Sequence, residues 1–423
     1  MMNEDHHVNQ IEKTEKRLCS NKKSNQMKPP RASRRQLLKV AASAAAGIMF
    51  PCLNLRAQQA KERLIVILSM DGLDPRYLEK SDVPNLRRLM KEGIFLTVKG
   101  VMPSVTNVNN ASIVTASFPQ SHGITSNYYY DPKTGNEYYM ESSDFVLKPT
   151  LFEKAQKKGY RTAFLTAKEK LLRLLNKGTD IGISAQNPPA EWIARIGKKE
   201  SMYSAEVNYW LFRAFHWTLR NSDSNLIYVA TTDYMMHTYA PEDEPSQIHL
   251  HTLDEMIGRA VNEYPHMELY MTADHGMNAK TEAIDLNKVF KTANMDALAV
   301  PIIKDRHVVH HKNMGGASYI YLKRKEQLDE TLSLLKALKG VDKAYTKEEA
   351  VKQFHLHQER IGDIFVLGDI HVAFGFLKEE REEISIRSHG SLFEAEVPLL
   401  AYGTKHKISD FKYNLDIGRR LEL

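Results

Sequence analysis

Cysteine is almost absent from this chain, and its scarcity limits the chemistry that a metal site could use. The 423 residues include two cysteines, Cys19 and Cys52, and both lie within the first 60 residues. The rest of the chain can therefore form neither a disulfide nor a thiolate metal site. Any metal ion would have to be held by oxygen and imidazole ligands, which makes Asp and His the residues of interest.

The apolar run near the N-terminus is too short for a membrane span. Residues 40–50 could not cross a hydrocarbon core of about 30 Å as a helix. Directly before them, Arg34 and Arg35 form the pair that is typical of a twin-arginine export signal. We expect residues 1–60 to be an export leader, the protein to be periplasmic or secreted, and no stable membrane anchor to be present. A basic tail followed by a buried helix is the alternative, and a lipid anchor at Cys52 is disfavoured because bulky residues precede it.

An excess of positive charge is missing from most of the chain. The formal net charge of +6 arises in residues 1–60, where Lys and Arg outnumber Asp and Glu, and the remainder is close to neutral. A protein that binds a nucleic-acid polymer usually carries a basic surface on its folded domain. We therefore expect a small-molecule substrate. The sequence does not fix the oligomeric state and leaves room for a homodimer.

Three short apolar runs share one design, in which an acidic residue follows the run. They read without alternation, as strands buried on both faces of a parallel sheet do. In open α/β sheets, ligands bind beyond the carboxyl ends of the strands, so the three acids should converge. The runs are residues 64–69, followed by Asp71; residues 225–230, followed by Asp233; and residues 268–272, followed by Asp274.

Helical stretches between these runs predict an α/β fold with a mostly parallel central sheet and helices on both faces. Residues 84–93 and 200–220 are among the expected helices. Residues 298–384 differ, because short strand candidates, including 307–310, surround one helix at 326–338. We expect an inserted α+β cap domain there, with residues 61–297 and 385–423 forming the metal-binding hydrolase core.

Histidines at workable spacing accompany two of the three acids. His237 follows Asp233 by four residues, so one helical turn would direct both toward one point. His275 is adjacent to Asp274, and His389 precedes a late strand. Three carboxylates and three imidazoles are the right number for two metal ions. Taken singly, each Asp could cap a turn or helix and each His could be an ordinary surface or core residue.

Thr106 is the candidate nucleophile, because it lies between a strand-like run and a helix-like run at 109–116. The N-terminus of a helix attracts phosphate and stabilises an alkoxide. Thr106 could instead cap that helix, and Ser104 is the rival nucleophile.

These motifs resemble the nucleotide pyrophosphatase/phosphodiesterase branch of the alkaline phosphatase superfamily, and within it most closely the phosphonoacetate hydrolases. The resemblance spans about residues 64–403 and is carried by residues 103–115, 122–127, 165–170, 231–233, 360–363 and 386–390.

The resemblance implies two divalent metal ions, most simply zinc. One ion would be held by Asp233, His237 and His389, and the other by Asp71, Asp274 and His275, with Thr106 contacting it. Asn127 would bind a phosphoryl oxygen, and Lys168 and Lys170 would bind the substrate carboxylate. His122 would be structural, and His310 and His311 would serve packing or a hinge.

The implied reaction is hydrolysis of the C–P bond of phosphonoacetate, to acetate and phosphate, through a phosphothreonine. A nucleotide-type phosphodiester hydrolase is the alternative, for which Tyr128 and its two neighbouring tyrosines could supply an aromatic slot. A surface lysine pair would be the ordinary reading of Lys168 and Lys170. An alternative of another class is a non-catalytic binding protein that is stabilised by its metals.

Overall fold

The computed structural model describes residues 63–306 and 311–423, so the expected leader, the strand at 307–310 and His310 lie outside the described residues. A seven-stranded sheet forms the centre, in the order β2-β16-β8-β1-β7-β5-β6. Strands β8, β1, β7, β5 and β6 run parallel, whereas β16 and β2 at one edge run antiparallel to their neighbours. The expected mostly parallel sheet is confirmed. Its strands are β1 (Ile65–Ser69), β2 (Ile94–Lys99), β5 (Thr162–Thr166), β6 (Ile181–Ser184), β7 (Leu226–Ala230), β8 (Glu268–Thr272) and β16 (Glu396–Tyr402).

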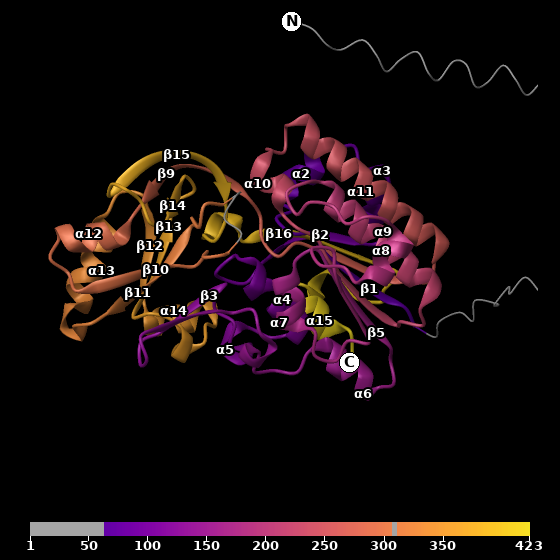
Figure 1. Ribbon diagram of the computed structural model, residues 1–423, viewed down its shortest axis with the longest axis horizontal. Coiled ribbons are helices and arrows are strands. Elements are labelled where there is room, and N and C mark those ends of the chain that lie inside the picture. Colours follow the sequence, from indigo (N-terminus) through magenta and orange to yellow (C-terminus); the bar gives the residue numbers. More distant parts are fainter. Residues whose placement is uncertain (1–62, 307–310) are drawn as a thin grey trace, which may run out of the picture. The chain divides into compact units, whose positions relative to one another are not determined.

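Helices lie in two groups, one on each face of this sheet (Figure 1). One group contains α2 (Pro75–Lys80), α3 (Pro84–Glu92), α8 (Ala190–Ile196), α9 (Glu206–Asn221), α10 (Tyr234–Thr238) and α11 (Glu244–Glu263). The other contains α4 (Thr106–Thr115), α5 (Pro119–His122), α6 (Leu151–Lys157), α7 (Glu169–Leu175) and α15 (Asp416–Arg420). Asp74 caps α2 by accepting the Arg76 N–H at 2.9 Å, and Gly93 ends α3.

The α9 helix begins later than its sequence suggests. We expected a helix from residue 200, but α9 begins at Glu206. The Ser201 hydroxyl accepts the Tyr203 N–H at 3.1 Å, and the Ser204 hydroxyl donates to the Ser201 carbonyl at 3.0 Å. Such local side-chain bonds compete with helical hydrogen bonds, which explains the late start.

Smaller sheets follow the core strands along the chain. An antiparallel sheet in the order β10-β11-β13-β12 includes the expected strands near residues 300, 320 and 365, and a three-stranded sheet has the order β14-β9-β15. Because β15 runs across residue 384, the predicted boundary there divides a strand; the division into core and cap stays a prediction. The elements are β9 (Asn278–Ile284), β10 (Ala297–Pro301), β11 (Ala317–Leu322), β12 (Val341–Thr346), β13 (Ile364–Gly368), β14 (Val372–Phe374), β15 (Arg381–Ser388), α12 (Leu286–Thr292), α13 (Leu328–Ala337), α14 (Lys347–Phe354) and the hairpin β3 (Tyr128–Asp131) with β4 (Asn136–Tyr139).

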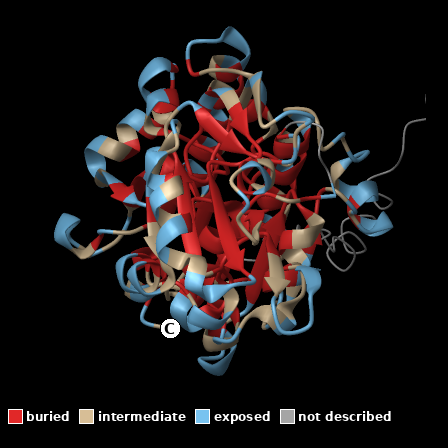
Figure 2. Cartoon of the chain, turned by 90° about the vertical axis from the view of Figure 1, so that its left-hand side faces the viewer, coloured by how far each residue is buried: buried red, intermediate tan, exposed pale blue. Residues whose placement is uncertain are grey.

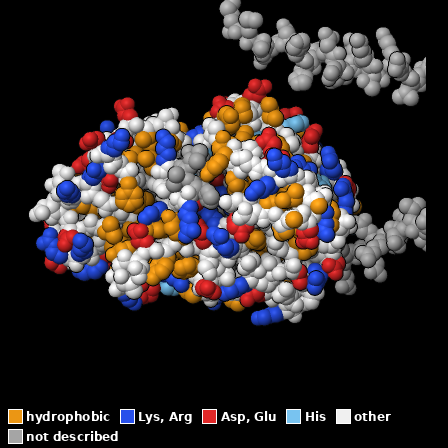
Figure 3. Space-filling view, viewed as in Figure 1, with side chains coloured by type: hydrophobic (Ala, Val, Ile, Leu, Met, Phe, Trp, Pro, Cys, Tyr) orange, Lys and Arg blue, Asp and Glu red, His pale blue; other side chains and the backbone are white. Residues whose placement is uncertain are grey.

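The central strands form the core of the protein. Every residue of β1, β5 and β7 is buried, whereas the outer sides of the covering helices are exposed (Figure 2). The exposed face in Figure 3 shows acidic side chains among the Lys and Arg side chains, in agreement with the near-neutral composition after residue 60. Among the described residues, none of the helices is long and apolar enough to cross a membrane.

Candidate metal centre and active site

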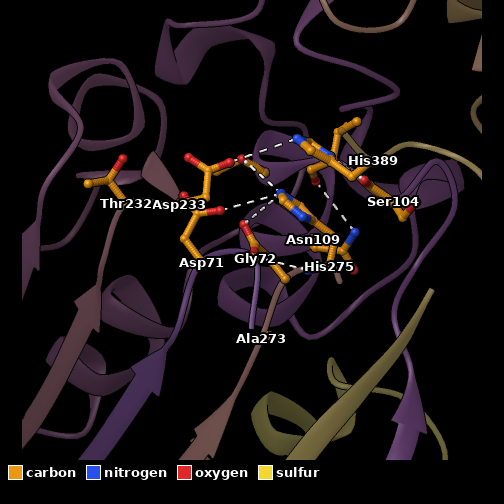
Figure 4. A network of polar contacts seen from close by, with 12 residues as sticks. Asp71, Gly72, Ser104, Asn109, Thr232, Asp233, Ala273, His275 and His389 are labelled. Carbon is orange, nitrogen blue, oxygen red and sulfur yellow. Dashed lines mark hydrogen bonds and ion pairs between the residues drawn. The ribbon is translucent and has the colours of Figure 1, made fainter. Parts of the chain in front are cut away.

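Three carboxylates meet beyond the ends of three adjacent parallel strands. Strand β1 lies between β7 and β8, and its last residue, Ser69, is in register with the last residue of each neighbour. Asp71, Asp233 and Asp274 follow these strand ends, and all three are buried. Figure 4 shows Asp71 and Asp233 pointing toward the same space as His275 and His389. The register of the sheet therefore places the acids together, although they are far apart in the sequence.

Gly72 makes this close approach of the loops possible. It has a φ of +72°, a left-handed conformation that favours glycine, and a Cβ there would lie 3.0 Å from the Cβ of Asp233. Its N–H donates to Oδ1 of Asp274 at 3.1 Å, and the His275 N–H donates to the same oxygen at 3.0 Å. Asp274 is thus held in place by backbone donors on both sides.

All three candidate histidines are oriented in the same way. In each ring Nδ1 contacts a backbone carbonyl: that of Arg387 for His237 at 2.7 Å, that of Gly276 for His275 at 3.0 Å, and that of Ser104 for His389 at 2.8 Å. A carbonyl can only accept, so Nδ1 carries the proton in each neutral ring. This arrangement directs the lone pair of Nε2 toward the carboxylates, as metal-binding histidines require.

The ring nitrogens and carboxylates form two donor groups that could each hold a metal ion. Donor atoms of Asp71, Asp274 and His275 lie within 4.8 Å of one another, and so do those of Asp233, His275 and His389. His237 joins the second group, since its Nε2 lies 3.0 Å from Oδ2 of Asp233. The rings of His275 and His389 stack with centroids 3.5 Å apart. Buried carboxylate oxygens and oriented imidazoles suit divalent cations such as zinc.

Burial shapes the protonation of the centre. It lowers the pKa of His275, and it lowers the pKa of His389 well below the usual value, helped by the neighbouring His275 and His237. Both rings are therefore neutral and able to act as ligands at physiological pH. Burial, together with Asp233 and Asp274, raises the pKa of Asp71 well above its usual value. Such a cluster of buried carboxylates requires positive charge nearby.

Lys168 supplies positive charge to this cluster. Its ammonium lies 2.5 Å from Oδ2 of Asp71 and 2.9 Å from Oδ1 of Asp233. Burial opposes the charged form, but Asp233 and Asp71 keep the pKa of Lys168 above its usual value. The residue expected to bind a substrate carboxylate therefore binds two carboxylates of the candidate metal site.

Thr106 is the first residue of α4, and its Oγ1 lies 3.4 Å from Nε2 of His275. The N-cap position is occupied by Val105, so Thr106 is not the capping residue. Ser104, the rival nucleophile, donates its hydroxyl hydrogen to the Ser391 carbonyl at 2.7 Å and accepts the Gly390 N–H at 3.2 Å. Its hydroxyl therefore joins two loops, whereas Thr106 faces the donor groups.

A pocket beside the donor groups is lined by residues from several elements. Thr106 and Asn127 form part of its wall, together with Lys168, Lys170, Asp233 and His389. Oδ1 of Asn127 accepts the Asn107 N–H at 3.3 Å, which leaves the Asn127 amide hydrogens to donate to a ligand. Lys170 forms an ion pair with Asp305 in the same wall.

His122 is buried away from the pocket, whereas His311 lines it. His122 is fully buried on α5 and contacts Ser112 Oγ at 2.9 Å, in agreement with a structural role. His311, expected to serve packing or a hinge, lines the pocket, and its ring centroid lies 6.0 Å from that of His237.

Asparagines that the sequence analysis did not single out hold the centre together. The amide of Asn110 donates to the Thr106 carbonyl at 3.0 Å and to Oδ2 of Asp274 at 3.2 Å, and its Oδ1 accepts the Tyr228 hydroxyl at 2.7 Å. Asn208 on α9 binds the backbone N–H and carbonyl of Thr232, each at 2.9 Å. The run of asparagines after Thr106 could have indicated Asn110. No pattern in the sequence indicates Asn208.

A family model supports this arrangement. The model for type I phosphodiesterase/nucleotide pyrophosphatase matches residues 65–392, which is most of the chain and includes every residue of the two donor groups. The chain belongs to this family. It is therefore a hydrolase that acts at phosphorus, and the resemblance noted in the sequence is confirmed.

Among solved structures, the phosphonoacetate hydrolase from Sinorhizobium meliloti, in complex with phosphonoacetate, is 29% identical with a TM-score of 0.78; the match covers 84% of this chain and 94% of that one. The same hydrolase in complex with phosphonoformate gives 30% identity, a TM-score of 0.76 and the same coverage. Murine ectonucleotide pyrophosphatase/phosphodiesterase 5 shares the fold, with a TM-score of 0.61 at 18% identity over 85% of this chain and 94% of that one.

Two curated relatives match at slightly lower identity. The bis(5'-adenosyl)-triphosphatase of Xenopus laevis is 25% identical over 77% of this chain and 68% of its own length. Its counterpart in Mus musculus is 27% identical over 55% of this chain and 52% of its own length. The match thus spans between about half and two thirds of these relatives.

Proposed function

We propose that this family member uses two zinc ions to hydrolyse the C–P bond of phosphonoacetate to acetate and phosphate, through a phosphothreonine at Thr106. The observation that carries the proposal is one pocket lined by Thr106, a pair of lysines and two candidate metal ligands, Asp233 and His389. The other donor group adjoins theirs, because the two groups have His275 in common. The similarity to a hydrolase crystallised with phosphonoacetate supports the choice of substrate.

Asp233, His237 and His389 would hold one ion, and Asp71, Asp274 and His275 the other, with Thr106 contacting it. When bound, the ions would supply Lewis-acid activation of the threonine hydroxyl and the phosphoryl oxygens. Two cations at these carboxylates would also compete with the Lys168 ammonium for oxygens of Asp71 and Asp233. Lys168 would then be available to the pocket that it already lines.

Thr106 would act as the nucleophile. Its hydroxyl loses a proton to solvent, Oγ1 attacks phosphorus in line, and the P–C bond breaks as the P–O bond forms. The electron pair of that bond passes to the methylene carbon and is delocalised into the carboxylate, and water then protonates the carbon to give acetate. The N-terminus of α4 favours negative charge at Thr106 during the attack. Attack of water on the phosphothreonine then releases phosphate and restores the threonine.

The remaining polar groups would position the substrate. The Asn127 amide would donate to a phosphoryl oxygen, because its orientation is fixed by the Asn107 N–H. Lys168 and Lys170 would hold the substrate carboxylate as negative charge builds on it, which gives the ammonium groups a larger effect on the transition state than on the bound substrate. A phosphate ester has no such carboxylate.

A nucleotide-type phosphodiester hydrolase is the second candidate. Tyr128 follows Asn127 directly, and its ring forms an edge-to-face pair with Tyr139 at 5.3 Å, with the Lys304 ammonium 4.3 Å from the Tyr128 ring. Tyr128 is buried and does not line the pocket, so its ring does not provide the aromatic slot that this candidate requires. The non-catalytic alternative does not agree with membership of a hydrolase family.

Phosphate release from phosphonoacetate, compared with p-nitrophenyl mono- and diesters, tests the proposal. Lys168→Ala and Lys170→Ala should each lower the rate on phosphonoacetate by roughly 30- to 1,000-fold, with a much smaller effect on the esters. Equal losses on all substrates would mean that the lysines support the site in general. Absence of phosphonoacetate turnover in the parent, alongside diester turnover, would favour the second candidate.

A further inference from the structure

The Lys170 ammonium already has a carboxylate partner within the pocket. Lys170 lies in the first turn of α7, and Asp305 lies in the segment between β10 and β11. The two side chains form an ion pair and are 12% and 7% exposed, so solvent screens the contact weakly. Both residues line the wall that also contains Thr106. The pair is thus part of the surface that a substrate would meet.

Asp305 has a second contact in addition to its ion pair with Lys170. The Asp305 N–H donates to the side-chain oxygen of Asn313 at 2.8 Å. Tyr203 lies in the same wall, and its pKa is raised by burial and by the nearby Asp305 carboxylate. The pocket therefore already contains a carboxylate, paired with Lys170, at the place where the proposed function requires a substrate carboxylate to bind.

We propose that Asp305 determines specificity, as an internal carboxylate that competes with the substrate carboxylate for Lys170. The inference rests on the proposed function, in which Lys170 receives that carboxylate. A ligand that carries a carboxylate must either displace Asp305 from the Lys170 ammonium or bind with its own carboxylate beside that of Asp305. Both requirements lower the affinity of the ligand. A ligand without a carboxylate can leave the Lys170–Asp305 pair intact. Asp305 thus sets how strongly the pocket prefers carboxylate-bearing phosphonates.

The test compares two inhibitors that differ in the carboxylate. Phosphonoacetate and methylphosphonate are titrated as inhibitors of p-nitrophenyl ester hydrolysis by the zinc-loaded parent and the Asp305→Asn variant. The inhibition constant of phosphonoacetate should fall about 10-fold in the variant, because an amide neither repels the carboxylate nor competes strongly for Lys170. That of methylphosphonate should change less than about twofold.

Three further variants complete the design. Asp296→Asn removes a carboxylate from an exposed ion pair with Lys323, at 3.3 Å, and should leave both inhibition constants at the parent values. The double variant Asp305→Asn with Lys170→Met should not show the fall in the inhibition constant of phosphonoacetate. Asp305→Ser repeats the test if the asparagine variant folds poorly, and calorimetric titration of the same two ligands replaces inhibition if ester turnover is too slow.

Equal changes for both ligands, or weaker binding of phosphonoacetate to the Asp305→Asn variant, would overturn the role of Asp305. A selective gain in affinity supports that role even where the parent does not turn phosphonoacetate over, an outcome that would count against the proposed substrate alone. The two failures are therefore distinguishable within one set of measurements.

Discussion

Nδ1 of His389 lies 2.8 Å from the backbone carbonyl oxygen of Ser104, which joins the loop of a candidate ligand to the loop that precedes Thr106. The Ser104 hydroxyl strengthens this link by donating to the Ser391 carbonyl at 2.7 Å. Residues 285 positions apart thus hold the candidate nucleophile and a candidate ligand in a fixed relationship.

A buried ion pair beneath this loop should be important for stability. Lys280 and Glu394 have fully buried side chains 2.9 Å apart, and Glu394 also accepts the Ser391 N–H at 3.0 Å. Lys280→Met leaves the carboxylate buried without its charged partner, so the free energy of unfolding should fall by about 3–5 kcal/mol. Denaturant unfolding measures the loss. Lys323→Met, in an exposed pair, is the matched control and should change stability by less than about 0.5 kcal/mol.

The Asn208 side chain should determine metal affinity through the loop that carries Asp233. Its amide binds both backbone groups of Thr232, so Asn208→Leu removes two hydrogen bonds next to a candidate ligand. We expect zinc affinity to weaken by about 10- to 100-fold, as measured by competition with a chromophoric chelator. Asn221→Leu on the exposed end of the same helix is the control. Unchanged affinity in the Asn208 variant would show that the loop holds its shape without this support.

Burial of His122 should make stability depend on pH. Burial lowers the pKa of His122 to about 3, and its Nδ1 accepts the Ile124 N–H at 3.1 Å, which requires a neutral ring. Between pH 6.5 and 3 the unfolded chain therefore binds a proton that the folded chain does not, so stability is lost as pH falls from 6.5 toward 3. At pH 4.5 the buried neutral His122 therefore lowers the free energy of unfolding by about 3 kcal/mol relative to its value above pH 6.5.

His122→Asn should remove that part of the pH dependence, since the amide oxygen replaces the acceptor without titrating. Unfolding of parent and variant at pH 7.5 and pH 4.5 gives the comparison, with metal present at the same free concentration. An identical pH dependence in the two proteins would rule out a titrating His122.

We propose that the N-terminal leader directs export by the twin-arginine route. Replacement of Arg34 and Arg35 by Lys should retain folded protein in the cytoplasm of a host with that pathway, as measured by cell fractionation. Arg31→Lys changes a basic residue outside the pair and should export normally. Periplasmic yield that does not depend on Arg34 and Arg35 would refute the proposal.

The sequence predicted the parts of the site that depend on local pattern. Buried strands are recognisable from unbroken apolar runs, so the strand-end positions of Asp71, Asp233 and Asp274 followed from sequence. The helical turn that contains His237 followed from its spacing to Asp233. Strand β9 was not expected, because its sequence is polar; its Lys280 is buried through an ion pair that no local signal shows.

Contacts between distant segments could not be predicted from local sequence patterns. The carbonyls that orient His237 and His389, and the carboxylate that pairs with Lys170, lie on segments brought together by the whole fold. Lys168 shows the same limit, since the family resemblance implied a substrate-binding residue but not its ion pairs with Asp71 and Asp233. Backbone groups and partners from other segments leave no periodicity in the sequence.

The role of Thr106 as the nucleophile is tested most directly by the Thr106→Ala variant, assayed for phosphonoacetate turnover and for bound zinc in the same preparation. Because the threonine supplies the nucleophile while Asp and His residues supply most metal ligands, turnover should fall below detection and zinc should remain near two ions per chain. Intact-mass measurement of the quenched parent should show a phosphorylated species that the variant lacks. Near-normal turnover in the variant, with zinc retained, would contradict the role of Thr106.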